Sequence, residues 1–373
     1  MALFDPRVLG GVPGGLRRER IQASPRFRNG RFHNTEPLAS PMTARPIREQ
    51  ASVFGEFFFG RAGRAPAGVV PVESPLAAWA RPPETGLRAT WLGHSTVLVE
   101  VDGFRVLTDP VWGERVSPFS FAGPRRFHEA PVEIDALPPL DAVVVSHDHY
   151  DHLDYPTIRA LARRGVPFVT SLGVGAHLEA WGVASSNIIE LDWWEETSLF
   201  GGSLGVTAAP SRHFSGRGTS SNRTAWSSFV IRTDRHRVFF SGDTGLTPEF
   251  EDIGRRLGPF DLVMLEIGAF HPSWGSIHLG PDNALAAHRM LGGGALLPVH
   301  WGTFDLALHP WDEPAETLAR EGAKLGAHLV MPRVGAPVEP SREDRIEPWW
   351  RSLSGARADL TSPSATTAAL QVP

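Results

Sequence analysis

Residues 141–154 constrain the fold of this chain more than any other segment. They begin with Ala142 to Val145, an apolar and mostly β-branched run without alternation, which is typical of a strand buried on both faces. A dense polar pattern, His-x-His-x-Asp-His, follows at once and consists of His147, His149, Asp151 and His152. Imidazoles and carboxylates at this density are ligands that divalent zinc prefers, and a rigid strand before them would fix their positions. A polar turn that caps a helix near Pro156 would explain Asp154 alone.

Three other candidate ligands also stand at the ends of apolar runs. His213 follows Leu204 to Ala209, Asp243 follows Arg237 to Ser241, and His300 follows Ala295 to Val299. In layered α/β proteins, sites gather at the carboxyl ends of strands because the strands hold position while the loops vary. Four separate segments of this kind predict one shared site.

Short motifs outside the histidine-rich loop narrow the family. Trp91-Leu-Gly-His94, Leu107-Thr-Asp109-Pro and His300-Trp-Gly-Thr-Phe304 accompany His-x-His-x-Asp-His. Together they resemble the metallo-β-lactamase fold and, within it, the branch of N-acyl-phosphatidylethanolamine-hydrolysing phospholipase D and its bacterial relatives. The similarity runs from about Gly86 to about Pro314. A more distant similarity, to ascorbate-phosphate lactonases of the same superfamily, shares the metal loop and stays open.

The resemblance implies an α/β fold, a four-layer αββα sandwich with an irregular N-terminal extension. Residues 1–85 are the expected extension, packed on the core, because Gly-Gly pairs and prolines interrupt any periodicity there. Residues 86–340 are the expected hydrolase domain, and residues 341–373 a tail that is partly disordered by composition.

Carried over position by position, the family motif implies a dinuclear metal centre. One cation would bind His147, His149 and His213, the other Asp151, His152 and His300, and Asp243 would bridge both. Zinc suits these ligands best, and iron and manganese stay open. Two such cations can hold a hydroxide between them near neutral pH, which serves phosphoryl transfer and ester or lactone hydrolysis equally.

Three residues outside the ligand set, together with the ligand Asp151, are expected to support the chemistry. Asp109 is expected beside the ligands, and His94 either orients the metal site or bonds backbone in a turn. Asp151 would orient the attacking hydroxide as well as bind metal. His278 precedes a helix, where it would protonate a leaving alkoxide or simply cap the helix.

The loop around His213 is expected to contact the substrate. It is rich in glycine and serine and carries Arg212, Arg217, Asn222 and Arg223. A guanidinium fork matches the oxygens of a phosphate diester, so the loop predicts a phosphate clamp. The alternative is a solvated loop whose charges serve solubility.

The overall composition excludes several classes of protein. The chain has 373 residues and a net charge of −5 with both signs mixed, so no broad basic face for nucleic acid is expected. The absence of cysteine excludes disulfides, thiolate ligands and a cysteine nucleophile. No apolar run reaches about 18 residues and the start lacks a secretory pattern. We therefore expect a cytoplasmic protein, with peripheral membrane contact left open and the oligomeric state unassigned.

Aromatic residues in the extension admit two interpretations. Phe27 and Phe32 alternate with arginines in residues 26–32, and we expect this arm to lie on the domain instead of contacting phosphate. Phe54 and the run Phe57 to Phe59 are expected to pack on the core, with a lipid interface as the alternative.

The resemblance implies a dinuclear-zinc hydrolase, most simply a phosphodiesterase of phospholipase D type that cleaves N-acyl-phosphatidylethanolamine or a related glycerophospholipid. The alternative enzyme is a lactonase or esterase that acts on a small substrate with or without a phosphate. A non-catalytic binding module is the third hypothesis. It is disfavoured because all seven ligand positions carry ligand-type residues.

Overall fold

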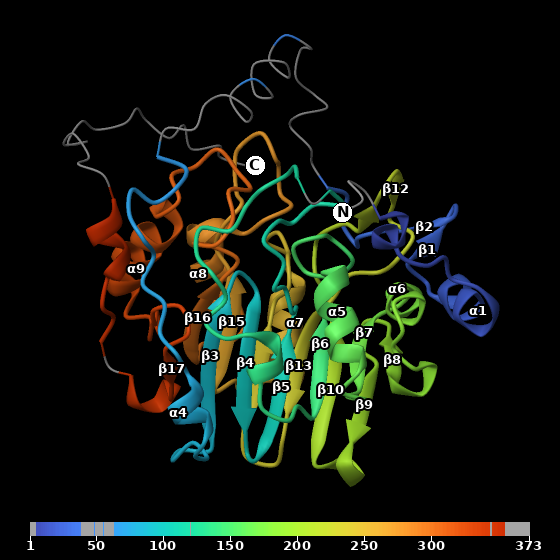
Figure 1. Ribbon diagram of the computed structural model, residues 1–373, viewed down its shortest axis with the longest axis horizontal. Coiled ribbons are helices and arrows are strands. Elements are labelled where there is room, and N and C mark those ends of the chain that lie inside the picture. Colours follow the sequence, from blue (N-terminus) through green and yellow to red (C-terminus); the bar gives the residue numbers. More distant parts are fainter. Residues whose placement is uncertain are drawn as a thin grey trace, which may run out of the picture.

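The computed structural model describes residues 5–38, 63–119, 121–343 and 345–354, together with Arg48 and Gly55. Two β-sheets pack face to face at the centre, and helices cover their outer faces (Figure 1). This arrangement is the expected four-layer αββα sandwich.

The first sheet has seven strands. Their order is β17 (Pro337–Val338), β3 (Leu87–Gly93), β4 (Thr96–Val101), β5 (Phe104–Thr108), β6 (Ala142–Val145), β7 (Phe168–Ser171) and β8 (Ile188–Leu191). Neighbours from β17 to β5 are antiparallel, whereas β5 to β8 run parallel. The metal loop predicted from the sequence therefore leaves the middle of a parallel half-sheet.

The second sheet has six strands. Their order is β16 (Ala295–Val299), β15 (Leu262–Glu266), β14 (Arg237–Phe240), β13 (Ser228–Arg232), β10 (Leu204–Ala209) and β9 (Glu196–Leu199). The first three run parallel and the others antiparallel. Two short hairpins lie outside both sheets, β1 (Phe27–Arg28) with β2 (Arg31–Phe32) and β11 (Gly216–Arg217) with β12 (Ser220–Ser221).

Side-chain alternation along β6 shows how the layers meet. Ala142 and Val144 belong to the core shared with the second sheet, whereas Val143 and Val145 pack in a cluster with Ile158 of α5 (Tyr155–Ala162). Both faces are apolar because both are covered, which explains why the run shows no alternation of polarity. The loop after β6 is thus attached to a strand held from two sides.

Helices form the two outer layers. α4 (Leu76–Trp79), α5 and α6 (Gly175–Ala180) contribute side chains to the outer core of the first sheet. α7 (Glu249–Leu257), α8 (Gly280–Met290) and α9 (Glu313–Leu325) join the core of the second sheet. Asp154 caps α5 by accepting a hydrogen bond from the Thr157 backbone nitrogen at 3.2 Å, as the pattern before Pro156 predicted.

The N-terminal extension is more regular than the sequence predicted. Residues 15–23 form helix α1 (Gly15–Ala23), which Figure 1 shows with the β1–β2 hairpin beside α6 and β8. Arg17 of α1 pairs with Glu179 at 2.7 Å and with Glu190 at 2.5 Å, and Ile21 is buried. Tertiary contacts therefore stabilise a short helix that has little apolar periodicity of its own.

The aromatic arm lies on the domain, as expected. Phe32 is buried, and Arg26 pairs with Asp192 at 2.5 Å while its guanidinium lies over the ring of Trp193. The predictions for Phe54 and Phe57 to Phe59 fall outside the described residues.

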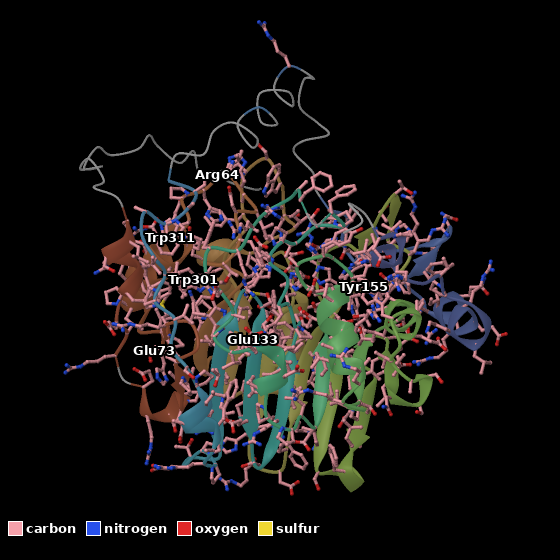
Figure 2. All side chains as sticks on the ribbon, in the orientation of Figure 1. Arg64, Glu73, Glu133, Tyr155, Trp301 and Trp311 are labelled. Carbon is pink, nitrogen blue, oxygen red and sulfur yellow. The ribbon has the colours of Figure 1, made fainter. Side chains whose placement is uncertain are left out.

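The last described residues also join the main core. The ring of Trp349 stacks on that of Trp301 with centroids 5.5 Å apart, and Figure 2 labels Trp301 among the side chains of this region. The predicted disorder of the tail concerns residues beyond Ser354, which are not described. Among the helices that the structure describes, none is both long and apolar enough to cross a membrane.

Candidate metal centre

The predicted ligands come together at one edge of the sandwich. The metal loop follows β6 of the first sheet, whereas His213, Asp243 and His300 follow β10, β14 and β16 of the second. The facing sheets deliver these residues to the same place because their strands end there. The prediction of a single shared site from four segments agrees with this geometry.

The first donor group consists of His147, His149, His213 and Asp243. One nitrogen or oxygen from each lies within 4.8 Å of the others. His147 Nε2 is 2.9 Å and His213 Nε2 is 3.3 Å from His149 Nδ1. Three ring nitrogens therefore point at a common centre, which the carboxylate of Asp243 approaches to 3.6 Å from His213 Nε2.

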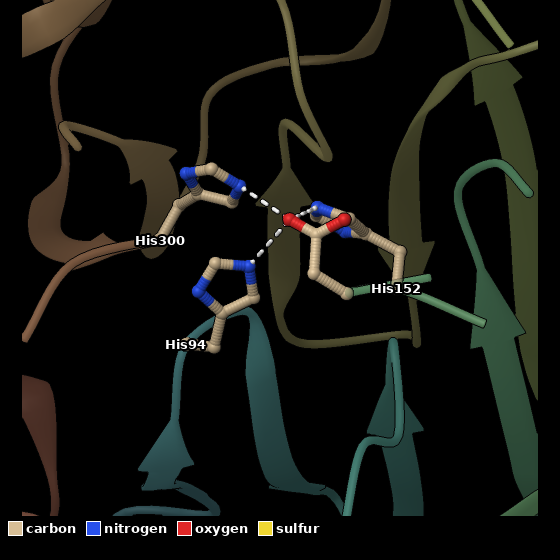
Figure 3. A group of neighbouring side chains, drawn as sticks. His94, His152 and His300 are labelled. Carbon is tan, nitrogen blue, oxygen red and sulfur yellow. Dashed lines mark hydrogen bonds and ion pairs between the residues drawn. The ribbon is translucent and has the colours of Figure 1, made fainter. Parts of the chain in front are cut away.

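The second donor group consists of Asp151, His152, His300 and His94. Figure 3 shows the three histidines turned toward one carboxylate oxygen. That atom, Asp151 Oδ2, lies 3.0 Å from His94 Nε2, 3.5 Å from His152 Nε2 and 3.3 Å from His300 Nε2. His94 thus lies close enough to Asp151 to orient its carboxylate.

Asp243 connects the two groups. Its Oδ2 is 3.1 Å from His152 Nε2, and its Oδ1 is 3.2 Å from His300 Nε2. Since the same carboxylate also reaches His213 of the first group, its position between both groups suits a bridging ligand.

The donor atoms fit divalent cations because several of them have no other partner. His152 Nε2, both ring nitrogens of His300 and Asp243 Oδ1 are buried without a hydrogen-bond partner among the described residues. Burial lowers the pKa of His300, but the adjacent carboxylates of Asp243 and Asp151 outweigh it and raise this pKa to about 10. The carboxylates of the cluster therefore favour a bound positive charge, which a divalent cation supplies.

Groups around the ligands fix which nitrogen of each ring is available. Asp109 Oδ2 accepts a hydrogen bond from His152 Nδ1 at 2.6 Å, so Nε2 of His152 is left for a cation. The carbonyl of Ile277 lies 2.9 Å from His213 Nδ1 and does the same for that ligand. His94 is neutral because burial and the neighbouring His300 lower its pKa to about 3.

A buried glutamate beside the centre was not predicted from the sequence. Glu266 lies at the end of β15, and its Oε2 accepts a hydrogen bond from His278 Nδ1 at 2.7 Å. The ring of His278 is 5.2 Å from the rings of both His213 and His300. The only sequence signal for Glu266 is its place at a strand end, where the ligands also stand.

The structure gives Arg217 supporting contacts that the sequence did not predict, and its predicted substrate contact stays a prediction. The residue is 6% exposed, and its Nε donates to the carbonyl of Val8 at 3.1 Å. Its Nη1 donates to the carbonyls of Asp148 and Leu153 at 2.7 and 2.9 Å. Backbone oxygens therefore use Nε and Nη1 of Arg217, whereas Nη2 is buried without a hydrogen-bond partner among the described residues.

The other residues of the predicted clamp also differ from the expectation. Arg212 donates to the carbonyls of Leu246 at 3.2 Å and Pro37 at 2.9 Å, and the side chain of Asn222 accepts from the backbone of Ser215 at 3.2 Å. Arg223 is exposed and has no polar contact within the described part of the chain. Of the three arginines, Arg223 is therefore the most exposed to solvent in the described part of the chain.

Comparison with known proteins identifies the family. The family profile described as "Beta-lactamase superfamily domain" matches residues 104–301, so the chain belongs to this superfamily. An uncharacterized protein of Mycobacterium tuberculosis is 44% identical over 93% of this chain and 92% of its own length. N-acyl-phosphatidylethanolamine-hydrolyzing phospholipase D 1 of Caenorhabditis elegans is 38% identical over 65% of this chain and 72% of its own.

A solved structure supports the fold. Igni18, a metallo hydrolase from the archaeon Ignicoccus hospitalis, covers 68% of this chain and 97% of its own with a TM-score of 0.52 and 23% identity. Family, relatives and donor groups together define a metal-dependent hydrolase of the metallo-β-lactamase superfamily.

Proposed function

We propose that the protein is a dinuclear-zinc phosphodiesterase of phospholipase D type that cleaves N-acyl-phosphatidylethanolamine or a related glycerophospholipid. His147, His149 and His213 would hold one cation, and Asp151, His152 and His300 the other, with Asp243 shared. When bound, two such cations activate water near neutral pH and neutralise charge that develops at phosphorus. The position of Asp243 between both donor groups carries the dinuclear part of the proposal, and the 38% identity to N-acyl-phosphatidylethanolamine-hydrolyzing phospholipase D 1 of Caenorhabditis elegans supports the substrate class.

His278 is the proposed proton donor to the leaving alkoxide. Its Nδ1 is held by the carboxylate of Glu266, so its Nε2 is the atom left to exchange a proton with the substrate. Glu266 is itself fully buried, so it holds the ring of His278 in one orientation. His278 is thus a catalytic residue in this proposal, and Glu266 is its positioning residue.

Asp151 and His94 would orient the attacking water. Neutral His94 has one ring proton, and its Nε2 lies 3.0 Å from Asp151 Oδ2. A hydrogen bond at this distance fixes the rotation of the carboxylate, which leaves Oδ1 in a constant direction.

A cavity beside the metal loop supports a lipid substrate. It has a volume of about 520 Å³, and its wall combines Val8, Phe119, Tyr150 and Tyr155 with charged side chains that include Arg7, Arg115 and Arg217. Tyr150 directly precedes Asp151, so the cavity adjoins the metal loop. An apolar chain gains free energy in proportion to the area it buries there. Phe119 is also 40% exposed, which suits peripheral contact with a lipid surface.

Product analysis with oxygen-18 tests the proposal. Zinc-loaded protein would be incubated with N-acyl-phosphatidylethanolamine in detergent and enriched water, and the products read by mass spectrometry. We expect labelled phosphatidate with unlabelled N-acylethanolamine, which requires attack at phosphorus. Intact lipid in the presence of two bound cations would contradict the phospholipase D assignment.

The second candidate is a lactonase or esterase that acts on a small substrate. It gains support from Arg212 and Arg217, because their side chains are used by backbone carbonyls and no longer favour a phosphate group. Turnover of phosphorylated and unphosphorylated lactones by the same zinc-loaded protein would separate this candidate from the first.

A further inference from the structure

One residue of the N-terminal extension holds the backbone of a predicted metal ligand. Asn34 Nδ2 donates to the carbonyl oxygen of His213 at 2.8 Å, and Asn34 Oδ1 accepts from the backbone nitrogen of His213 at 3.1 Å. The two bonds use both ends of one amide and both polar groups of one peptide residue. In the described part of the chain the His213 backbone makes no other hydrogen bond.

The orientation of this amide is supported by a third contact. Asn34 Oδ1 also accepts from Nε1 of Trp226 at 3.0 Å, and Trp226 is 1% exposed. An indole nitrogen can only donate, and Nε1 of Trp226 also donates to the Ser211 carbonyl at 3.1 Å, so this shared contact agrees with the orientation that the two bonds to the His213 backbone require. The contact with Trp226 therefore joins the Asn34 amide, and with it the His213 backbone, to the core.

His213 needs such support because it stands outside the sheet. Strand β10 ends at Ala209, so no ladder bond fixes the backbone at position 213. The ring is held at Nδ1 by the Ile277 carbonyl, which sets its rotation, and Asn34 sets the place from which the ring projects. Together these contacts determine where Nε2 points.

A second contact joins the extension to the metal loop. Nε1 of Trp181 donates to the carbonyl of Arg7 at 2.6 Å, which holds residues 6–9 against the domain. The next carbonyl, that of Val8, accepts from Arg217, which in turn donates to the carbonyls of Asp148 and Leu153. The extension thus contacts the backbone of His213 directly and the metal loop through Arg217.

We propose that the N-terminal extension is a structural part of the metal centre and that Asn34 is the positioning residue for its first donor group. This inference rests on the assignment of His213 as a ligand under the proposed function. Contacts that orient a ligand change metal affinity by about 10- to 100-fold when they are removed. The extension therefore contributes to cation affinity as well as to the surface of the domain.

Cobalt titration of the full chain tests this inference. Metal-free protein would be titrated with Co²⁺. Visible absorption and a competing chromophoric chelator would give two dissociation constants. The constant that is lost in His213→Gln belongs to the first donor group. For Asn34→Ala we expect that constant to rise about 10- to 100-fold with a changed cobalt spectrum, while the second constant stays within about threefold. Two wild-type constants and a wild-type spectrum in Asn34→Ala would overturn the inference.

Two further variants keep the result interpretable. Arg17→Ala loosens α1 from Glu179 and Glu190 without touching a ligand, so both constants should stay at wild-type values even if the protein melts earlier. Asn34→Asp keeps the acceptor but loses the donor to His213, and it carries the test if Asn34→Ala does not fold. Wild-type constants in Asn34→Asp would then overturn the inference. Wild-type protein that binds fewer than two cations would instead contradict the proposed metal centre itself.

Discussion

The ends of the strands and the arginine-rich loop between Ser211 and Arg223 both carry polar side chains near the centre, yet they use them differently. At the strand ends, His152, His300 and Asp243 keep buried donor atoms without a partner. In the loop, Arg212 and Arg217 give their donors to backbone carbonyls. Residue type alone made both regions candidates for ligand contact.

Both regions contain buried polar atoms without a partner, including Arg212 Nε and Arg217 Nη2 in the loop, but only at the strand ends do such atoms belong to donor groups whose ligand atoms lie within 4.8 Å of one another among the described residues. A buried polar atom without a partner costs free energy, so a fold that keeps several such atoms together supplies something else to satisfy them. The guanidinium of Arg217 gives two of its three nitrogens to backbone carbonyls and so holds the loop in place. The following predictions test this distinction in order of decreasing effect.

Loss of a ligand should have the largest effect. In His300→Gln we expect kcat/KM to fall by about a thousandfold, roughly 4 kcal/mol, because a cation contributes several kcal/mol to the stabilisation of developing charge. Metal content and turnover are measured together. His288→Gln is the matched control, since His288 is also buried and its side chain bonds only the Gly294 carbonyl, at 2.9 Å, among the described residues. Near-wild-type turnover in His300→Gln would remove His300 from the centre.

Removal of the proposed proton donor should have the next largest effect. His278→Ala is expected to lower kcat by about 10²- to 10³-fold on a substrate with an alkoxide leaving group. On a nitrophenyl diester the loss should be much smaller, because nitrophenolate leaves without a proton. Glu266→Gln should show the same pattern with a loss of about tenfold, since it only positions His278. An equal loss on both substrates would contradict the role of His278 as an acid.

Arg217→Ala should affect stability more than substrate binding. The substitution leaves the carbonyls of Val8, Asp148 and Leu153 without their donor, and we expect the free energy of unfolding to fall by about 2–4 kcal/mol. Urea denaturation of metal-loaded protein measures this change, and KM should remain at the wild-type value. A raised KM with unchanged stability would restore the phosphate clamp.

Arg223→Ala should have the smallest effect. The side chain is exposed, so stability should change by less than about 0.5 kcal/mol. If Arg223 contacts an anionic substrate, KM should rise by up to about fivefold at low ionic strength, and the rise should vanish at high salt. Kinetics at two salt concentrations measure this effect, and a salt-independent rise would exclude a charge contact.

Much of the fold and of the site was predictable because it is encoded locally. An apolar run predicts the strand at Ala142 to Val145. Asp154 followed closely by a proline predicts the helix cap. The fold class of the sandwich, predicted from the motifs, is confirmed by the family match. Helix α1 was not predicted, because ion pairs to residues more than 150 positions away stabilise it.

The sequence by itself determined which residues are able to bind metal and at which strand ends they stand, because residue type and apolar periodicity are local properties. Only the tertiary structure decided how each polar group is used. It joined Glu266 to His278, gave the donors of Arg217 to the metal loop, and brought Asn34 from the extension to the backbone of His213. These pairings depend on distances between segments far apart in the chain, and no local pattern specifies them.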